Sequence, residues 1–173
     1  MADCNRESHS QKKGEARVKV LPDEITNEFR GHRCSALAFL IIALVSLARS
    51  LAHIFLPDGG AGSIATIDLG VEGAGTIVSM FALWGLSQLL MSVFYVIVYF
   101  RYKSLIPLMY IFVIAEYAGR IAIGQFKPVE TVGVAPGAVG NFLILPLAIV
   151  LFLFSMGEGN APATSTRPIQ TGQ

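Results

Sequence analysis

The sequence predicts an all-α, polytopic membrane protein with four transmembrane helices in a bundle. Two observations lead to this prediction. Hydrophobic residues make up 53% of the 173 residues and charged residues only 14%, and the mean hydropathy is +0.59, which is too apolar for a soluble domain of this size. In addition, four apolar segments have the length of about 20 residues that a helix needs to cross a hydrocarbon core about 30 Å thick.

The four segments follow one another with short connections, and none alternates apolar and polar residues as a β-barrel strand would. We expect the membrane-spanning helices at residues 34–56, 75–100, 104–123 and 138–156. The flanking residues 1–33 and 157–173 are rich in charged or small polar residues, which is typical of disordered tails. Within the first tail, Asp23–Phe29 is expected to form a short amphipathic helix.

The distribution of Lys and Arg between the connections predicts the orientation. Residues 1–33 hold seven Lys and Arg, and the tight connection at 101–103 holds two, whereas the loop 57–74 holds none. By the positive-inside rule, both termini are therefore cytoplasmic, and the loop 57–74 lies outside. Since the sequence contains no Asn-x-Ser/Thr sequon, we expect a prokaryotic inner membrane rather than the secretory pathway.

Two pairs of ionisable side chains interrupt the apolar segments. Arg49 and His53 are four residues apart, as are Glu116 and Arg120, so each pair shares one face of a helix. A charged side chain at the centre of a membrane helix costs roughly 2.5 to 3.5 kcal/mol even on the most lenient insertion scale. We therefore expect these four side chains to face the interior of the bundle.

Counted from the outer ends of the predicted spans, these polar side chains form a layer. Arg49 and Glu116 lie about 10 Å deep, and His53 and Arg120 lie about 5 Å deep, with Asn141 entering at a similar level. Two arrangements are open. Arg49 bridges to Glu116 across the helices and forms a polar pocket, or Glu116 pairs with Arg120 along its own helix while Arg49 extends toward the headgroups.

The second span carries a polar and aromatic stripe that we expect to face inward, because an amide near mid-membrane would lack partners in lipid. The stripe recurs at helical spacing and consists of Trp84, Gln88, Ser92, Tyr95 and Tyr99. It serves either interhelical hydrogen bonding or a substrate channel. On the third span, the small-xxx-small pair Ala115 and Gly119 predicts close helix approach.

Two blocks in the last three spans carry a pattern of their own, RYKSLIPLMYIFVIAEYAGRIAIGQFKP and PGAVGNFLILPLA. The residues that define it are Arg101, Pro107, Glu116, Gly119, Arg120, Lys127, Pro128, Pro136, Gly137, Gly140, Asn141 and Pro146. These blocks resemble the DoxX-like group of small prokaryotic four-helix membrane proteins. The resemblance implies a fold and a membrane address but no particular activity.

Three functions fit these features. The first is binding or passing a small solute, a proton or a lipid headgroup through a polar pocket in the outer half of the bundle. The second is an accessory or structural subunit whose ion pairs fix helix packing, and the third is a lipid- or quinone-directed enzyme with Glu116 and His53 as acid and base. The binding residues expected for the first are Arg49, His53, Glu116, Arg120, Asn141, Gln88 and Trp84.

The partners expected are the lipid bilayer and either further copies of the chain or a larger membrane complex. With only three His in the chain, no metal site is expected, and no residue pattern indicates a cofactor. The glycines between 57 and 75 lack the preceding strand of a phosphate-binding loop, so we expect neither nucleotide nor nucleic-acid binding.

Overall fold

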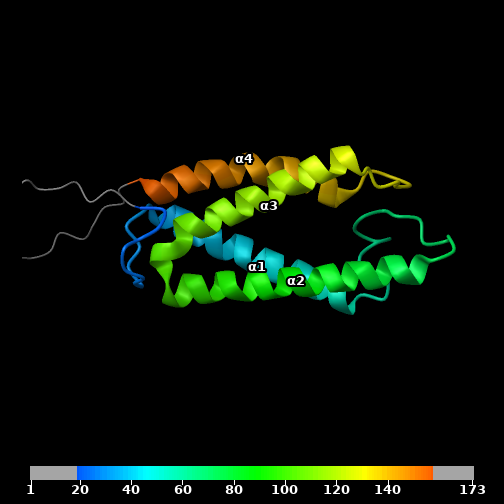
Figure 1. Ribbon diagram of the computed structural model, residues 1–173, viewed down its shortest axis with the longest axis horizontal. Coiled ribbons are helices and arrows are strands. Elements are labelled where there is room, and N and C mark those ends of the chain that lie inside the picture. Colours follow the sequence, from blue (N-terminus) through cyan, green and yellow to red (C-terminus); the bar gives the residue numbers. More distant parts are fainter. Residues whose placement is uncertain (1–18, 158–173) are drawn as a thin grey trace, which may run out of the picture.

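The computed structural model describes residues 19–157, and this part of the chain contains helices and connections but no strand (Figure 1). The helices are α1 (Arg33–Phe55), α2 (Ala74–Arg101), the single 3₁₀ turn η1 (Lys103–Leu105), α3 (Ile106–Phe126) and α4 (Pro136–Met156). The four α-helices are long and apolar enough to cross a membrane. The prediction of an all-α chain with four long apolar helices is confirmed.

The largest difference from the predicted helix boundaries is at the end of α3. We expected this helix to end at residue 123, but it continues to Phe126. It stops where Lys127 leaves the helical region, with φ −135° and ψ 73°, because the following Pro128 disfavours helical backbone at the residue before it. Glu116 therefore lies midway along α3, about 15 Å from either end, deeper than expected.

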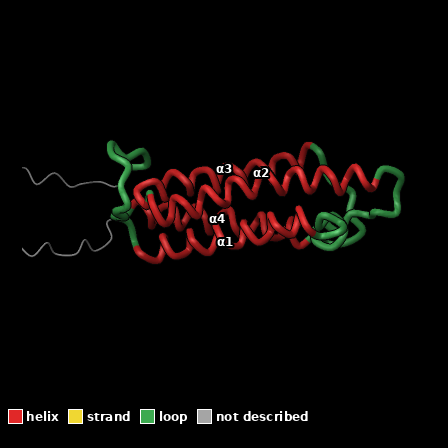
Figure 2. The backbone as a smooth tube through the Cα atoms, turned by 90° about the horizontal axis from the view of Figure 1, so that it is seen from below, coloured by secondary structure: helices red, strands yellow, loops and turns green. Residues whose placement is uncertain are grey.

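The helices form two hairpins. α1 packs along α2, and α3 packs along α4, whereas α2 and α3 contact each other little. We call the end near residues 19–32 and η1 the terminal end, and the end with loops 56–73 and 127–135 the loop end. Figure 1 shows α3 starting beside the end of α2 and diverging from it toward the loop end, and Figure 2 shows all four helices running lengthwise between the two ends.

Aromatic packing joins the two hairpins at the terminal end. Phe39 of α1 makes edge contacts with the rings of Tyr95 and Tyr110, at centroid distances of 5.5 and 5.6 Å. The Tyr110 hydroxyl donates a hydrogen bond to the Ser35 carbonyl (2.7 Å), and the Ser35 hydroxyl donates one to the Leu151 carbonyl (3.1 Å). These contacts connect all four helices around a closed core.

Part of the predicted N-terminal tail is ordered against this end. The Thr26 amide donates a hydrogen bond to the Ser104 hydroxyl (3.0 Å), and the Ser104 amide donates one to the Thr26 carbonyl (3.2 Å). The expected helix at Asp23–Phe29 is wrong, because the backbone here bends and uses its polar groups to hold the turn at η1. The rest of the predicted tails, residues 1–18 and 158–173, lies outside the described residues.

The loop end also joins the two hairpins. The Val132 amide donates a hydrogen bond to the Thr66 carbonyl (2.9 Å), and the Thr66 hydroxyl donates one to the Gly133 carbonyl (3.2 Å). The loops after α1 and after α3 are thus connected. The hairpins meet at both ends and leave room between them in the middle.

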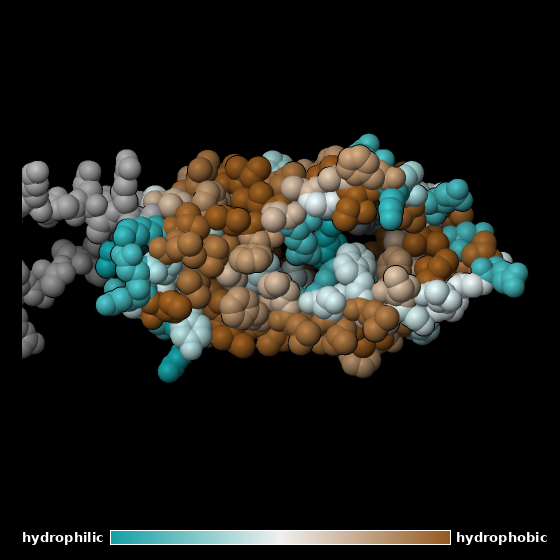
Figure 3. All heavy atoms as spheres, viewed as in Figure 1, coloured by the Kyte–Doolittle hydropathy of each residue, from teal (hydrophilic) through white to brown (hydrophobic). Residues whose placement is uncertain are grey.

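The face seen in Figure 3 is largely apolar between two hydrophilic ends. Large apolar side chains are exposed on every helix, for example Ile41, Leu90, Phe112 and Leu147. A surface of this kind is expected for helices that face lipid.

Candidate functional site

A cavity of about 360 Å³ lies between the first hairpin and α3. α1 and α2 supply most of its wall, and α3 supplies the opposite side, with no lining residue from α4. It is lined by Ser46, Arg49, Trp84, Ser87, Gln88, Met91, Ser92, Tyr95, Phe112, Ala115 and Glu116. Four of the seven predicted binding residues line it: Arg49, Trp84, Gln88 and Glu116.

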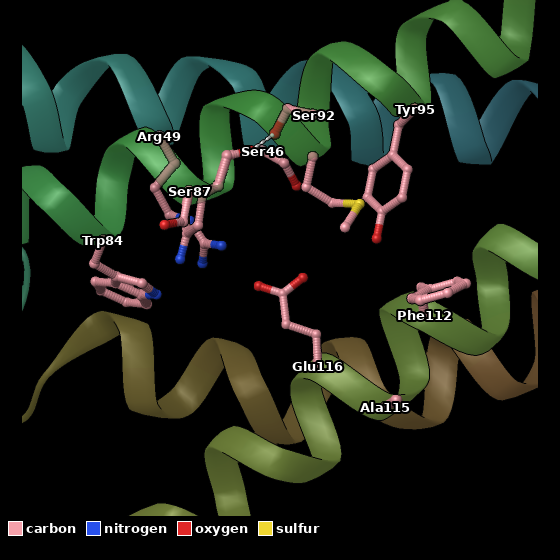
Figure 4. Close-up of a pocket in the computed structure, with 11 residues that line it drawn as sticks. Ser46, Arg49, Trp84, Ser87, Ser92, Tyr95, Phe112, Ala115 and Glu116 are labelled. Carbon is pink, nitrogen blue, oxygen red and sulfur yellow. Dashed lines mark hydrogen bonds between the residues drawn. The ribbon is translucent and has the colours of Figure 1, made fainter.

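Arg49 and Glu116 face each other across this cavity. Figure 4 shows the guanidinium of Arg49 and the carboxylate of Glu116 pointing toward one another from opposite walls. The carboxylate pairs instead with Arg120, one turn further along α3. Among residues 19–157, no ion pair joins Arg49 to Glu116. Of the two arrangements left open by the sequence, the pair along α3 is present, and Arg49 faces the cavity.

Polar atoms in the wall of the cavity lack partners. The Nε atom of Arg49 is buried without a hydrogen bond, and so are both side-chain polar atoms of Gln88, whose residue is only 8% exposed. Ser92, one turn from Gln88, uses its hydroxyl to bond the Gln88 carbonyl (2.7 Å). One guanidinium nitrogen and one whole amide beside the cavity therefore have unused hydrogen-bonding capacity.

Arg120 does not line the cavity, but it borders it. Its guanidinium carbon lies 4.8 Å from the centroid of the Trp84 ring and 5.3 Å from that of Tyr117. Cation–π contacts of this kind stabilise a charge whose hydration is reduced. Arg120 thus has Glu116 as its counter-ion and two aromatic rings beside it.

His53 and Asn141 are placed differently from the other predicted site residues. His53 is buried behind Trp84, with ring centroids 5.0 Å apart, and its Nδ1–H donates to the Gly59 carbonyl (2.8 Å). Because a carbonyl can only accept, Nδ1 carries the proton. Asn141 lies in the second turn of α4, and α4 contributes nothing to the cavity. His53 anchors the loop after α1, and Asn141 is away from the site.

Several lining residues are not among the binding residues that the sequence predicts. Ser46 lies three residues before Arg49, and Phe112 lies four residues before Glu116, so helical spacing from the ionisable residues would have found both. Ser87 and Met91 flank the predicted stripe by one position, which widens the cavity-facing side of α2. Tyr99, the last member of that stripe, is not among the lining residues.

The cavity opens through the flank of the molecule. In Figure 3 a hollow with hydrophilic side chains interrupts the apolar surface midway between the two ends. In the same view, Figure 1 places the divergence between α2 and α3 at this position, with α1 behind it. The opening is therefore lateral, between the closed aromatic core at the terminal end and the joined loops at the loop end.

The loop after α1 is held together by Asp58. Its carboxylate accepts hydrogen bonds from the amides of Gly60 (2.9 Å) and Ser63 (2.7 Å). These hydrogen bonds favour the ionised form and lower the pKa of Asp58 from 3.8 to about 2, and the bond from Ser63 has the largest effect. This carboxylate therefore helps to keep the loop folded beside His53.

The lowered pKa of Asp58 makes the loop sensitive to acid. Its stabilising effect should be complete above about pH 4 and should disappear as the pH falls through the folded-state pKa of about 2. The ¹³C shift of the Asp58 carboxyl carbon should titrate with a midpoint near 2, and Asp58→Ala should increase amide exchange over residues 59–67 at neutral pH. Glu72→Ala, in the same loop, is the control. A midpoint at the ordinary value would contradict the hydrogen bonding described.

Comparison with known proteins gives no relative from which a role could be transferred: no family model, no curated protein and no solved structure matches the chain. The resemblance to the DoxX-like group therefore stays a prediction. The function has to be inferred from the cavity itself.

Proposed function

We propose that this chain is an integral membrane protein that binds a small ligand in the cavity between its two hairpins. Four apolar helices and an apolar flank support insertion across a bilayer. Arg101 and Lys103 at the terminal end, and Asp58, Asp68 and Glu72 at the loop end, support an orientation with the terminal end in the cytoplasm. The cavity, whose lining residues lie near the middle of α1, α2 and α3, would then lie near the centre of a prokaryotic inner membrane, deeper than the outer half that the sequence predicts.

One observation supports ligand binding above the others: the unpaired polar atoms of Arg49 and Gln88 in one wall of the cavity. A buried polar group without a partner costs about 1 to 3 kcal/mol. Several such groups facing one cavity are typical of a site completed by a ligand. Since the aromatic core around Phe39 closes the terminal end, the geometry supports binding rather than passage through the bundle.

A structural role is the second candidate, and the ion pair between Glu116 and Arg120 favours it. This pair, with the rings of Trp84 and Tyr117 beside it, would fix packing in an accessory subunit of a membrane complex. Such a role does not explain why Arg49 faces the cavity without a counter-ion. It predicts a protein that is fully stable and unresponsive to ligands.

The chain provides its own reporter for the test, because Trp84 is its only tryptophan and lines the cavity. Delipidated protein in neutral detergent should be titrated with a bacterial polar lipid extract and with small organic acids, alcohols and amines. We expect at least one of these to change Trp84 emission saturably. Ala115→Phe, which fills the cavity, should abolish the change, whereas Ala118→Phe, on the exposed side of α3, should preserve it. Emission that no probe alters in any variant would contradict the proposal.

A further inference from the structure

The charges around the cavity do not balance. Away from the helix ends, the only formally charged residues of the four α-helices are Arg49, Glu116 and Arg120. Glu116 is already paired with Arg120, which leaves one positive charge on Arg49. An uncompensated charge in a medium of low dielectric constant is costly unless something neutralises it. A ligand with a single negative charge would do so.

The cavity also has the donors that a small anion requires. Arg49 offers a planar guanidinium that can bind two oxygens of a carboxylate or phosphate together. Gln88 offers an amide donor without a partner, and Figure 4 shows the indole nitrogen of Trp84 turned toward the cavity. Arg49 and Trp84 thus point donors into the space opposite Glu116, and Gln88 lies in the same wall.

The way into the cavity indicates where the anion comes from. The opening is on the apolar flank, at the position where α2 and α3 diverge (Figures 1 and 3), and both ends of the bundle are joined by hydrogen bonds. The lining includes Met91 and Phe112, which are also exposed at the surface and suit a hydrocarbon chain better than water. A ligand that enters here would come from the bilayer.

We propose that the cavity binds the monoanionic headgroup of an amphiphile that enters sideways from the membrane, with a carboxylate or phosphodiester on Arg49 and Gln88 and the chain leaving between α2 and α3. This proposal rests on the proposed function and adds the class of ligand. It assigns Arg49 the role of anion receptor. Glu116, which is held by its ion pair with Arg120, forms part of the opposite wall.

The test uses quenching of Trp84 by lipids with brominated chains, since bromine quenches tryptophan only at short range. The full-length protein is reconstituted in phosphatidylcholine vesicles that contain increasing fractions of brominated phosphatidylglycerol or, in a parallel series, brominated phosphatidylcholine. We expect stronger quenching by the anionic lipid. Arg49→Met should weaken its apparent affinity about tenfold, which corresponds to the loss of one charge-assisted interaction, and should leave quenching by the zwitterionic lipid unchanged.

Further variants and ligands distinguish a failure of the anion preference from a failure of the binding site itself. If both lipids quench Trp84 equally and Ala115→Phe abolishes this quenching, the anion preference would be overturned, but the cavity would still be a binding site. Quenching that neither Arg49→Met nor Ala115→Phe alters would overturn both proposals. In plain phosphatidylcholine vesicles, acetate and inorganic phosphate should leave Trp84 emission unchanged, and a saturable response to either would overturn the lateral origin of the ligand.

Discussion

Replacing Gly85 by alanine should destabilise the protein by about 1 to 3 kcal/mol, the usual effect of adding atoms to a tightly packed contact. A Cβ at this position would lie 2.6 Å from the Cβ of His53 and 3.2 Å from the Ser50 carbonyl oxygen. α1 and α2 would therefore have to separate next to Trp84. Thermal unfolding in neutral detergent, followed by far-UV circular dichroism, measures the loss.

Gly119 provides the matched control, since it is also a glycine inside a helix, but a Cβ added there would meet no neighbouring atom within 4 Å. Gly119→Ala should leave stability unchanged or raise it by up to about 1 kcal/mol, because alanine is the better helix former. Equal effects at the two glycines would contradict the close packing of α1 on α2.

Glu116→Gln should have a second large effect, a loss of about 3 kcal/mol, as is typical when one partner of a buried ion pair is removed. The pair is substantially shielded, with side-chain exposures of 34% for Glu116 and 15% for Arg120. The substitution would leave Arg120 and Arg49 as two positive charges without a carboxylate between them. Denaturation in a series of detergent mixtures measures the change, with Glu72→Gln in the exposed loop as control.

The double variant Glu116→Gln, Arg120→Gln distinguishes the effect of the unpaired charge on stability from the effect of altered packing. It returns the net charge of the cavity to that of the wild type, so it should recover much of the stability lost in Glu116→Gln. Strictly additive losses would show that the two side chains do not interact, contrary to the pairing described.

The sequence predicts the four helices well and predicts the cavity only in part. Composition and the length of the apolar segments suffice for four helices, because a lipid-facing helix needs little more than apolar side chains. The inward stripe with Trp84 and Gln88 was predictable, since an amide in lipid has no alternative partner. The same reasoning grouped Arg49 with Glu116, and both line the cavity.

The arrangement of the hairpins was not predictable, because helices that are apolar on every side do not reveal which face packs on which neighbour. Small residues on α3 suggested close approach near Gly119, but the close contact is at Gly85 of α2. The extent of the opening between α2 and α3 depends on tertiary contacts at both ends, such as Thr66 with Gly133. No local pattern encodes contacts of this kind.

If Arg49 serves a ligand rather than the fold, its removal should not destabilise the free protein. The most direct test is to compare the melting temperatures of Arg49→Met and Arg120→Met in neutral detergent without anionic amphiphiles. Arg49 has a buried Nε without a partner, whereas Arg120 has Glu116 and two aromatic rings. We predict an unchanged or higher melting temperature for Arg49→Met and a decrease of about 5 °C or more for Arg120→Met. A decrease for Arg49→Met as large as that for Arg120→Met would contradict a ligand-binding role of Arg49.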